Sequence, residues 1–109
     1  MIGDDGVACR LADNHFYVSA TTSGVDRIYQ QMLQWNAQWR LDVDVANVSA
    51  AFAAVNLAGP QSRKVLQKVC TDVDLSAQGF PYLGVRRGTV AGIPARILRV
   101  GFVLSLIHI

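Results

Sequence analysis

Apolar side chains recur at helical spacing between Val25 and Trp39, and this pattern constrains the fold more than any other stretch of the chain. Charged and amide side chains fill the positions between them, so a helix here has one apolar and one polar face. The preceding residues 21–24 offer hydroxyl groups that can cap a helix. We therefore predict an amphipathic helix of about four turns. The apolar positions are Val25, Ile28, Tyr29, Met32, Leu33, Trp35 and Trp39.

Two pairs of strand-like segments predict two β-hairpins. Residues 6–11 and 15–20 alternate or carry β-branched and aromatic side chains, and an Ala-Asp-Asn turn sequence separates them. Residues 83–90 and 93–102 have the same character on either side of Ala91-Gly92. We expect each pair to form an antiparallel hairpin.

The residues between these hairpins predict two further strands and a second helix. Residues 41–45 alternate strictly, as a strand with one solvated face does. Residues 51–58 form a nearly continuous apolar run, which is typical of a strand buried on both faces, although a short helix gives the same pattern. Gly59-Pro60 ends this run, and Pro60 suits the first turn of a helix because it lacks an N–H. The apolar positions of that second helix are Val65, Leu66 and Val69.

The predicted order of elements is ββ-α-ββ-α-ββ. This order indicates an α+β fold, with a mainly antiparallel sheet and two helices packed on it.

The net charge of +2 is spread thinly along the chain, whereas a nucleic-acid surface needs a dense basic stripe, so we expect no nucleic-acid partner. No apolar run approaches the roughly 20 residues of a membrane span, and we expect no membrane association. Two cysteines, Cys9 and Cys70, are too few for a disulfide framework, and we predict buried, reduced thiols in a cytoplasmic protein.

Few residues carry recognisable catalytic chemistry. The histidines are His15, in a predicted strand, and His108, so a nucleophile–histidine pair has little to build on, and we predict no metal site. Asp4 and Asp5 stand just before the first strand, where one carboxylate can hold a cationic amine or an N–H of a ligand. A tight turn over residues 3–6 explains the same sequence, and from the residues alone the turn is the stronger reading.

A second candidate is the connection over residues 57–62. A predicted strand leads into Gly59-Pro60, and the helix that follows begins with exposed N–H groups that can meet an anion or a ligand carbonyl. From the residues alone, an ordinary strand-to-helix connection is the stronger explanation. Composition and spacing alone therefore lead to an α+β domain with two candidate ligand-contacting segments.

Several segments, taken in order, resemble a known family. They are Asp4-Asp5-Gly6-Val7 with Arg10-Leu11, Asp13-Asn14-His15-Phe16-Tyr17-Val18, Thr21-Thr22-Ser23-Gly24, Leu57-Ala58-Gly59-Pro60-Gln61-Ser62-Arg63, and Gly88-Thr89-Val90-Ala91-Gly92-Ile93-Pro94-Ala95-Arg96 leading to Arg99-Val100-Gly101-Phe102. Together they resemble the folate-binding aminomethyltransferase domain of glycine-cleavage T-protein, dimethylglycine dehydrogenase and the alpha subunit of heterotetrameric sarcosine oxidase. The resemblance runs from Met1 to about Val103, and the Asp-Asp-Gly-Val opening favours the sarcosine oxidase alpha branch.

The resemblance implies a reaction and a set of site residues. A one-carbon unit from an amine such as sarcosine or glycine is transferred to tetrahydrofolate, giving 5,10-methylenetetrahydrofolate. In the family an aspartate at the start of this strand orients and stabilises the cationic carbon. By position this role falls on Asp4 and Asp5, and we favour Asp5. The implied folate-contacting positions are Thr21, Thr22, Gly59, Arg99 and Phe102.

The resemblance also bears on the extent of the domain. In the family a Gly-Glu-x-Gly-Tyr-Glu-like segment, whose glutamate holds the pterin ring, follows the strand that ends here at Phe102. This chain instead continues with Val103 and then Leu-Ser-Leu-Ile-His-Ile, which is similar to a translated sequencing adapter. We therefore predict a partial folate-binding domain over residues 1–103 and a non-native tail over 104–109, the alternative being a natural strand. On this reading the parent is an enzyme and the fragment is inactive.

Partners follow from the same resemblance. Folate and a small amine are the expected ligands, and the parent is compatible with FAD or FMN and NAD in other domains or subunits and with the other subunits of a hetero-oligomeric oxidase. The alternatives are a non-catalytic folate-binding protein and a subunit-interaction domain, for which the Trp35 and Trp39 face of the first helix offers a surface.

Overall fold

The computed structural model describes residues 3–101. Phe102 and the predicted tail over residues 104–109 lie outside these described residues, so the expectations for them stay predictions. The chain divides into two compact units, Met1–Val55 and Asn56–Ile109, and each is described here by itself. Among the described residues, no helix combines the length and the apolar character needed to cross a membrane.

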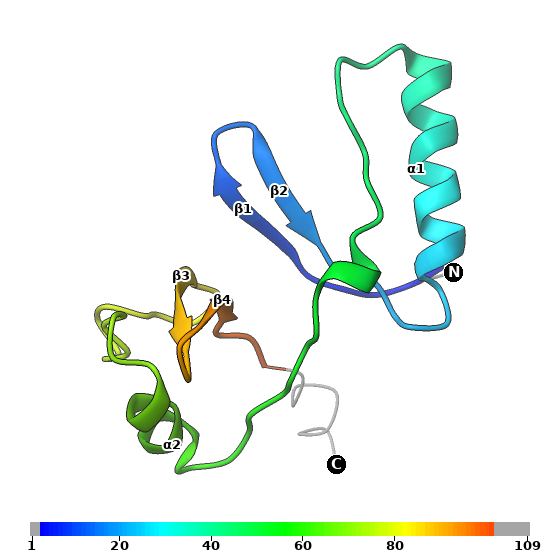
Figure 1. Ribbon diagram of the computed structural model, residues 1–109. Coiled ribbons are helices and arrows are strands. Elements are labelled where there is room, and N and C mark those ends of the chain that lie inside the picture. The colour runs from blue at the N-terminus through cyan, green and yellow to red at the C-terminus, as the bar shows by residue number, and fades with distance from the viewer. Residues whose placement is uncertain (1–2, 102–109) are drawn as a thin grey trace. The chain divides into compact units, whose positions relative to one another are not determined.

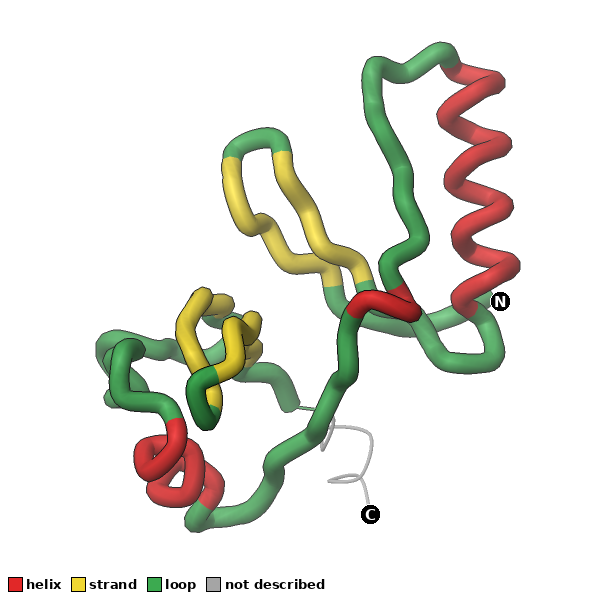
Figure 2. The backbone as a smooth tube through the Cα atoms, viewed as in Figure 1, coloured by secondary structure: helices red, strands yellow, loops and turns green. Residues whose placement is uncertain are grey.

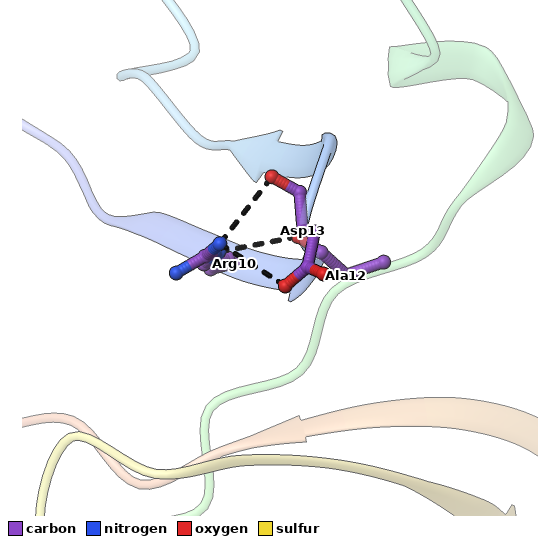
Figure 3. Close-up of polar contacts among 3 residues, drawn as sticks. All are labelled: Arg10, Ala12 and Asp13. Carbon is purple, nitrogen blue, oxygen red and sulfur yellow. Dashed lines mark hydrogen bonds and ion pairs between the residues drawn. The ribbon is translucent and has the colours of Figure 1, made fainter.

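The first unit opens with a β-hairpin in which β1 (Ala8–Ala12) pairs antiparallel with β2 (His15–Val18) (Figure 1). The register slips between Arg10 and Ala12, where the chain enters the turn. Figure 3 shows the Arg10 side chain folded back over this turn, with Nε donating to the Ala12 carbonyl at 3.3 Å and Nη2 to Asp13 Oδ1 at 3.2 Å. Both side chains of this ion pair are exposed, where water screens the attraction, so the hairpin depends mainly on its backbone ladder.

The first predicted helix is confirmed as α1 (Val25–Trp39). At its start the Thr21 carbonyl accepts the N–H groups of Gly24 at 3.1 Å and Val25 at 2.9 Å. At its end Arg40 adopts a left-handed conformation with φ 52°, and Leu41 N donates back to Asn36 O at 3.2 Å. Both ends are therefore satisfied by backbone bonds rather than by a side chain on the cap residue.

The two strands predicted between the helices are not formed. Residues 41–45 and 51–58 lie in a loop that contains only the short 3₁₀ helix η1 (Ser49–Ala51), as Figure 2 shows. Most apolar side chains there are exposed, 54% for Val43 and 89% for Val55, and Val45 is half-buried. An extended segment becomes a strand only when a neighbour pairs its backbone, and within residues 3–101 each of the two sheets holds a single hairpin.

The second unit is built from α2 (Ser62–Val69), β3 (Val85–Val90) and β4 (Ile93–Leu98). The antiparallel pairing of β3 with β4 and the helix after Gly59-Pro60 confirm the predictions for this part. The turn residues Ala91 and Gly92 have φ values of 51° and 80°. Two positive φ values in a two-residue turn match the right-handed twist of the flanking strands.

The α+β class is thus confirmed, whereas the expected single sheet is replaced by two separate hairpins. Within the second unit α2 packs on β3, whereas within the described part of the first unit α1 makes no contact with β1 or β2. Cys9 and Cys70 are both buried thiols, as expected.

A small core holds the second unit together. Cys70, Leu75, Phe80 and Ile97 are its buried members, at 2% to 9% exposure. The loop between α2 and β3 supplies Leu75 and Phe80, and Arg86 holds this loop by donating to the Gly79 carbonyl from Nε and Nη2. A loop that carries core side chains is thus fixed by charge-assisted bonds to its backbone.

Asp72 joins this loop to β3. Its Oδ1 accepts the Thr89 N–H at 3.0 Å, and its Oδ2 accepts the Thr89 hydroxyl at 3.0 Å. The close approach requires Gly88, because a Cβ there would overlap the Val73 side chain. The Thr89 N–H lowers the pKa of the Asp72 carboxyl most, and the Thr89 hydroxyl adds to this effect against an opposing contribution from burial.

The lowered pKa of Asp72 predicts acid sensitivity of the second unit. A carboxyl with a depressed folded-state pKa contributes stability that is present above its ordinary pKa of about 3.9 and is lost as the pH falls through the folded-state value. We expect the free energy of unfolding, measured by urea titration with the Ile97 methyl NMR signal, to fall progressively as the pH is lowered below about 4.

Two variants separate the contribution of Asp72 to acid stability from the general effect of removing one carboxylate charge. Asp72→Asn should lower stability at pH 6 and flatten the decline in acid. Asp42→Asn, which removes a carboxylate from the first unit, should leave both unchanged. An acid profile in Asp72→Asn identical to that of the unaltered chain would contradict the assignment.

Candidate functional site

The carboxylate pair lies on an extended segment that continues the first hairpin beyond its paired strands. Val7 N donates to Ser19 Oγ at 3.1 Å, and Ser19 N donates to the Val7 carbonyl at 2.9 Å. A Cβ at Gly6 would overlap the Ser19 carbonyl, so only glycine allows this approach. Residues 3–7 form no turn, which removes the turn explanation of the Asp-Asp sequence.

Residues 3 and 4, at the beginning of this segment, contact the start of α1. Arg27, in the first turns of α1, donates from Nη2 to the Gly3 carbonyl at 2.6 Å. The Asp4 carboxylate lies beside Thr21 and Gly24, and a Cβ at Gly24 would overlap it. The first unit therefore brings together Asp4, Thr21 and the N-terminus of α1, which are far apart in the sequence.

Asp4 is the more enclosed of the two carboxylates. Its Oδ1 accepts the Asp5 N–H at 2.7 Å, and its Oδ2 is buried without a partner of full hydrogen-bond geometry. The Asp5 N–H lowers the pKa of Asp4 most; the nearby Thr21 side chain adds to this effect, burial opposes it, and the Arg27 charge contributes less. Asp4 is therefore held as an anion at a helix N-terminus, where negative charge is favourable.

Asp5 has the opposite surroundings. It is exposed, and within the described residues its carboxylate makes one hydrogen bond, from the Gly6 N–H to Oδ1 at 2.8 Å. A carboxylate has about four acceptor positions, so most of its capacity stays open to a ligand. The family resemblance favours Asp5 over Asp4 as the ligand-facing carboxylate, and this role of Asp5 stays a prediction.

Thr21 and Thr22 differ sharply although they are adjacent. Thr21 Oγ1 accepts the Gly24 N–H at 3.1 Å and its carbonyl accepts the first N–H groups of α1. Thr22 is exposed, and its side chain makes no hydrogen bond within the described part of the chain. Thr21 thus shapes the start of α1, while a folate contact by either threonine stays a prediction.

The other predicted site residues lie in the second unit. Gly59 has φ 119°, a left-handed conformation that favours glycine, and its carbonyl accepts the Ser62 N–H at 3.1 Å at the start of α2. Arg99 donates from Nη1 to the Phe80 carbonyl at 2.8 Å and so helps to hold the core loop. A folate contact by Gly59 or Arg99 stays a prediction, and Phe102 lies outside the described residues.

Sequence reasoning missed the residues that surround Asp4. Ser19, Gly24 and Arg27 hold or accommodate the segment that carries the carboxylates. The available signal was Gly24 itself, a glycine directly before a strongly amphipathic helix. The sequence pattern indicates a capping segment there, whereas the missing side chain of Gly24 makes room for the Asp4 carboxylate.

Comparison with known proteins connects this geometry to a family. Residues 1–106 match the family model of the GCVT N-terminal domain. The chain belongs to this family. The resemblance noted from the sequence motifs is therefore confirmed. No solved structure matches the chain.

Relatives of two kinds share most of the chain. The sarcosine oxidase subunit alpha of Corynebacterium sp. (strain U-96) is 36% identical over 94% of this chain, and that of Rhizobium meliloti (strain 1021) is 35% identical over 84%. The aminomethyltransferase of Alkaliphilus metalliredigens (strain QYMF) is 32% identical over 91%. The chain spans only 11%, 9% and 26% of these three proteins respectively.

The threonine pair offers a matched test of the α1 start. Thr21→Ala removes the hydroxyl acceptor of the Gly24 N–H and leaves its carbonyl acceptor, and it should lower the stability of the first unit by about 0.5 to 1 kcal/mol. Thr22→Ala removes no bond and should change it by less than about 0.5 kcal/mol. Thermal unfolding followed by circular dichroism at a helix-sensitive wavelength measures both. Equal effects of the two substitutions would contradict the assigned role of Thr21.

Proposed function

We propose that this chain forms part of a tetrahydrofolate-dependent aminomethyl-transfer domain, in which the Asp5 carboxylate faces the cationic one-carbon unit during transfer. The observation that carries the proposal is the contrast between the two carboxylates. Asp5 is exposed and makes a single bond to Gly6, whereas Asp4 is enclosed beside Gly24. Family membership supports the reaction class, because relatives carry the names aminomethyltransferase and sarcosine oxidase subunit alpha.

The residues present fit part of a folate site. The pterin ring of tetrahydrofolate and an amine-derived cation both offer N–H groups or positive charge, and the open acceptor positions of Asp5 suit such groups. When bound, tetrahydrofolate supplies the ring amine that attacks the one-carbon unit. The chain's own contribution is the Asp5 charge, which attracts and orients the cation and stabilises positive charge as it shifts during transfer.

The backbone around Asp5 suits this task because it is held on both sides. On one side, the Asp5 N–H donates to Asp4 Oδ1. On the other side, Val7, two residues after Asp5, donates its N–H to Ser19 Oγ. A preorganised charge needs no reorganisation at the moment of reaction, which is the condition for effective electrostatic stabilisation. Placement of Asp5 on extended backbone rather than on a flexible turn therefore favours the catalytic interpretation.

The whole protein's reaction belongs to the same proposal. The resemblance to the sarcosine oxidase alpha branch suggests that the parent is a cytoplasmic alpha-type subunit. We propose that it acts on sarcosine or a similar amine and yields 5,10-methylenetetrahydrofolate. It would work with further subunits and with FAD or FMN and NAD bound elsewhere. The names of the sarcosine oxidase relatives support the subunit arrangement.

A second candidate function has its own observation. Trp35 and Trp39 stack with ring centroids 4.7 Å apart and are 43% and 59% exposed on α1. Large exposed aromatic side chains are enriched where proteins meet, so a subunit-interaction domain is the alternative. It predicts that Trp39→Ala impairs assembly of the complete protein while Asp5→Asn changes nothing.

The Asp5 charge gives the direct test. In the complete protein that contains this chain, Asp5→Asn should leave folding intact and reduce aminomethyl transfer to tetrahydrofolate by about 10²-fold or more, because a single preorganised electrostatic group is worth about that much. The rate is measured as folate-dependent formation of 5,10-methylenetetrahydrofolate.

Asp26→Asn is the matched control for this test. Asp26 is an exposed carboxylate in the first turn of α1, so its loss removes the same charge nearby without touching the Asp5 backbone. Transfer should then stay within about threefold of the unaltered rate. An unchanged rate in Asp5→Asn would refute the proposed function.

A further inference from the structure

The Asp4 carboxylate has two contacts that point in different directions. Oδ1 accepts the backbone N–H of Asp5 at 2.7 Å, a length typical of charge-assisted bonds. Oδ2 is buried, and the carboxylate packs where Gly24 has no side chain. One small group therefore touches both the start of α1 and the backbone of the candidate catalytic residue.

These contacts leave Asp4 poorly placed to bind substrate itself. Oδ1 already accepts the Asp5 N–H, and Oδ2 is buried, so less of the Asp4 carboxylate than of the Asp5 carboxylate is open to a ligand. The neighbouring Arg27 guanidinium already contributes positive charge, and it anchors Gly3 at 2.6 Å. The surroundings of Asp4 therefore support a holding role rather than direct contact with a ligand.

We propose that Asp4 is a positioning residue: its carboxylate fixes the Asp5 backbone against the start of α1, and so sets the direction from which the Asp5 side chain meets its ligand. This inference rests on the function proposed for Asp5. It differs from the expectation that Asp4 and Asp5 are both catalytic, because Asp4 acts through shape and hydrogen bonding, whereas Asp5 acts through charge.

Gly24 contributes to this positioning because it leaves room for the Asp4 carboxylate. Its φ of −104° is accessible to any residue, so alanine fits the backbone there, but the added Cβ would overlap the Asp4 carboxylate. Gly24→Ala should therefore displace the Asp4 side chain without changing its chemistry, and it also crowds the Thr21 hydroxyl, which would lie 2.8 Å from the added Cβ. This variant separates the position of the carboxylate from its presence.

Four variants test the proposal. Asp4→Asn keeps the shape and an oxygen that can accept the Asp5 N–H, while Asp4→Ala removes the acceptor. Gly24→Ala displaces the carboxylate by steric overlap. Asp26→Asn, in the first turn of the same helix, removes an equal charge that makes no contact with Asp5.

The first measurement uses this chain alone and does not depend on catalysis. In the Asp5→Asn background, the amide proton of residue 5 is followed by NMR between pH 2 and pH 6. It should shift with a single titration whose pKa lies below the ordinary aspartate value, the signature of a bond to Asp4. Adding Asp4→Asn should abolish the titration and retain the hydrogen-bonded chemical shift. Adding Asp4→Ala or Gly24→Ala should lose both, and an amide unaffected by Asp4→Ala would overturn the proposal.

The second measurement is aminomethyl transfer by the complete protein. Asp4→Ala and Gly24→Ala should lower kcat about tenfold or more with little change in KM for the amine, because misplacement of a catalytic group affects the transition state most. Asp4→Asn should stay within about threefold and Asp26→Asn should be unchanged. A loss in Asp4→Asn as large as that in Asp5→Asn would overturn the positioning role and make Asp4 a charged participant.

The two measurements separate the possible failures. If Asp5→Asn leaves transfer unchanged while the amide titration behaves as expected, the proposed function fails and the contact between Asp4 and the Asp5 backbone stands. If Asp5→Asn abolishes transfer but the amide is independent of Asp4, the function stands and the positioning role fails.

Discussion

Every extended segment of this protein depends on whether its backbone N–H and C=O groups find partners. β1 and β2 satisfy each other, as do β3 and β4, and the short turns between them keep each partner close in sequence. The segment before β1 is held in the same way, through Val7 and Ser19. The apolar run over residues 51–58 joins neither of the two sheets in the described part of the chain and stays in a loop. Pairing, rather than apolar character, decides which segments become strands.

The same constraint explains which parts of the fold were predictable. The helices and hairpins follow from local signals: helical spacing from Val25 to Trp39, the glycine at 92, and the Gly59-Pro60 break. The strands expected at 41–45 and 51–58 required partners that no local pattern specifies. Their hydrophobic pattern indicates a preference for extended backbone. The sequence carries no comparable signal that identifies a neighbouring strand to pair with either segment.

The candidate site shows a similar division between local and distant information. The Asp-Asp sequence identified the carboxylates, and family resemblance favoured Asp5. What distinguishes the two is the environment of Asp4, which depends on Thr21 and Gly24 beyond the first hairpin. No spacing rule connects a glycine before a helix to a carboxylate before a strand. The structure supplies that connection through the chain reversal of the hairpin, which returns residues 19–24 to the segment that contains Asp4.

The stacked pair Trp35 and Trp39 has a practical consequence. These are the two tryptophans of the chain, and both lie in α1, within the first unit. Intrinsic tryptophan fluorescence therefore reports on α1, whereas the second unit contributes only tyrosine emission, from Tyr82. Selective excitation of tryptophan can thus follow loss of structure in one half of the protein, and comparison with a probe of the core around Phe80 would reveal whether the two halves unfold together.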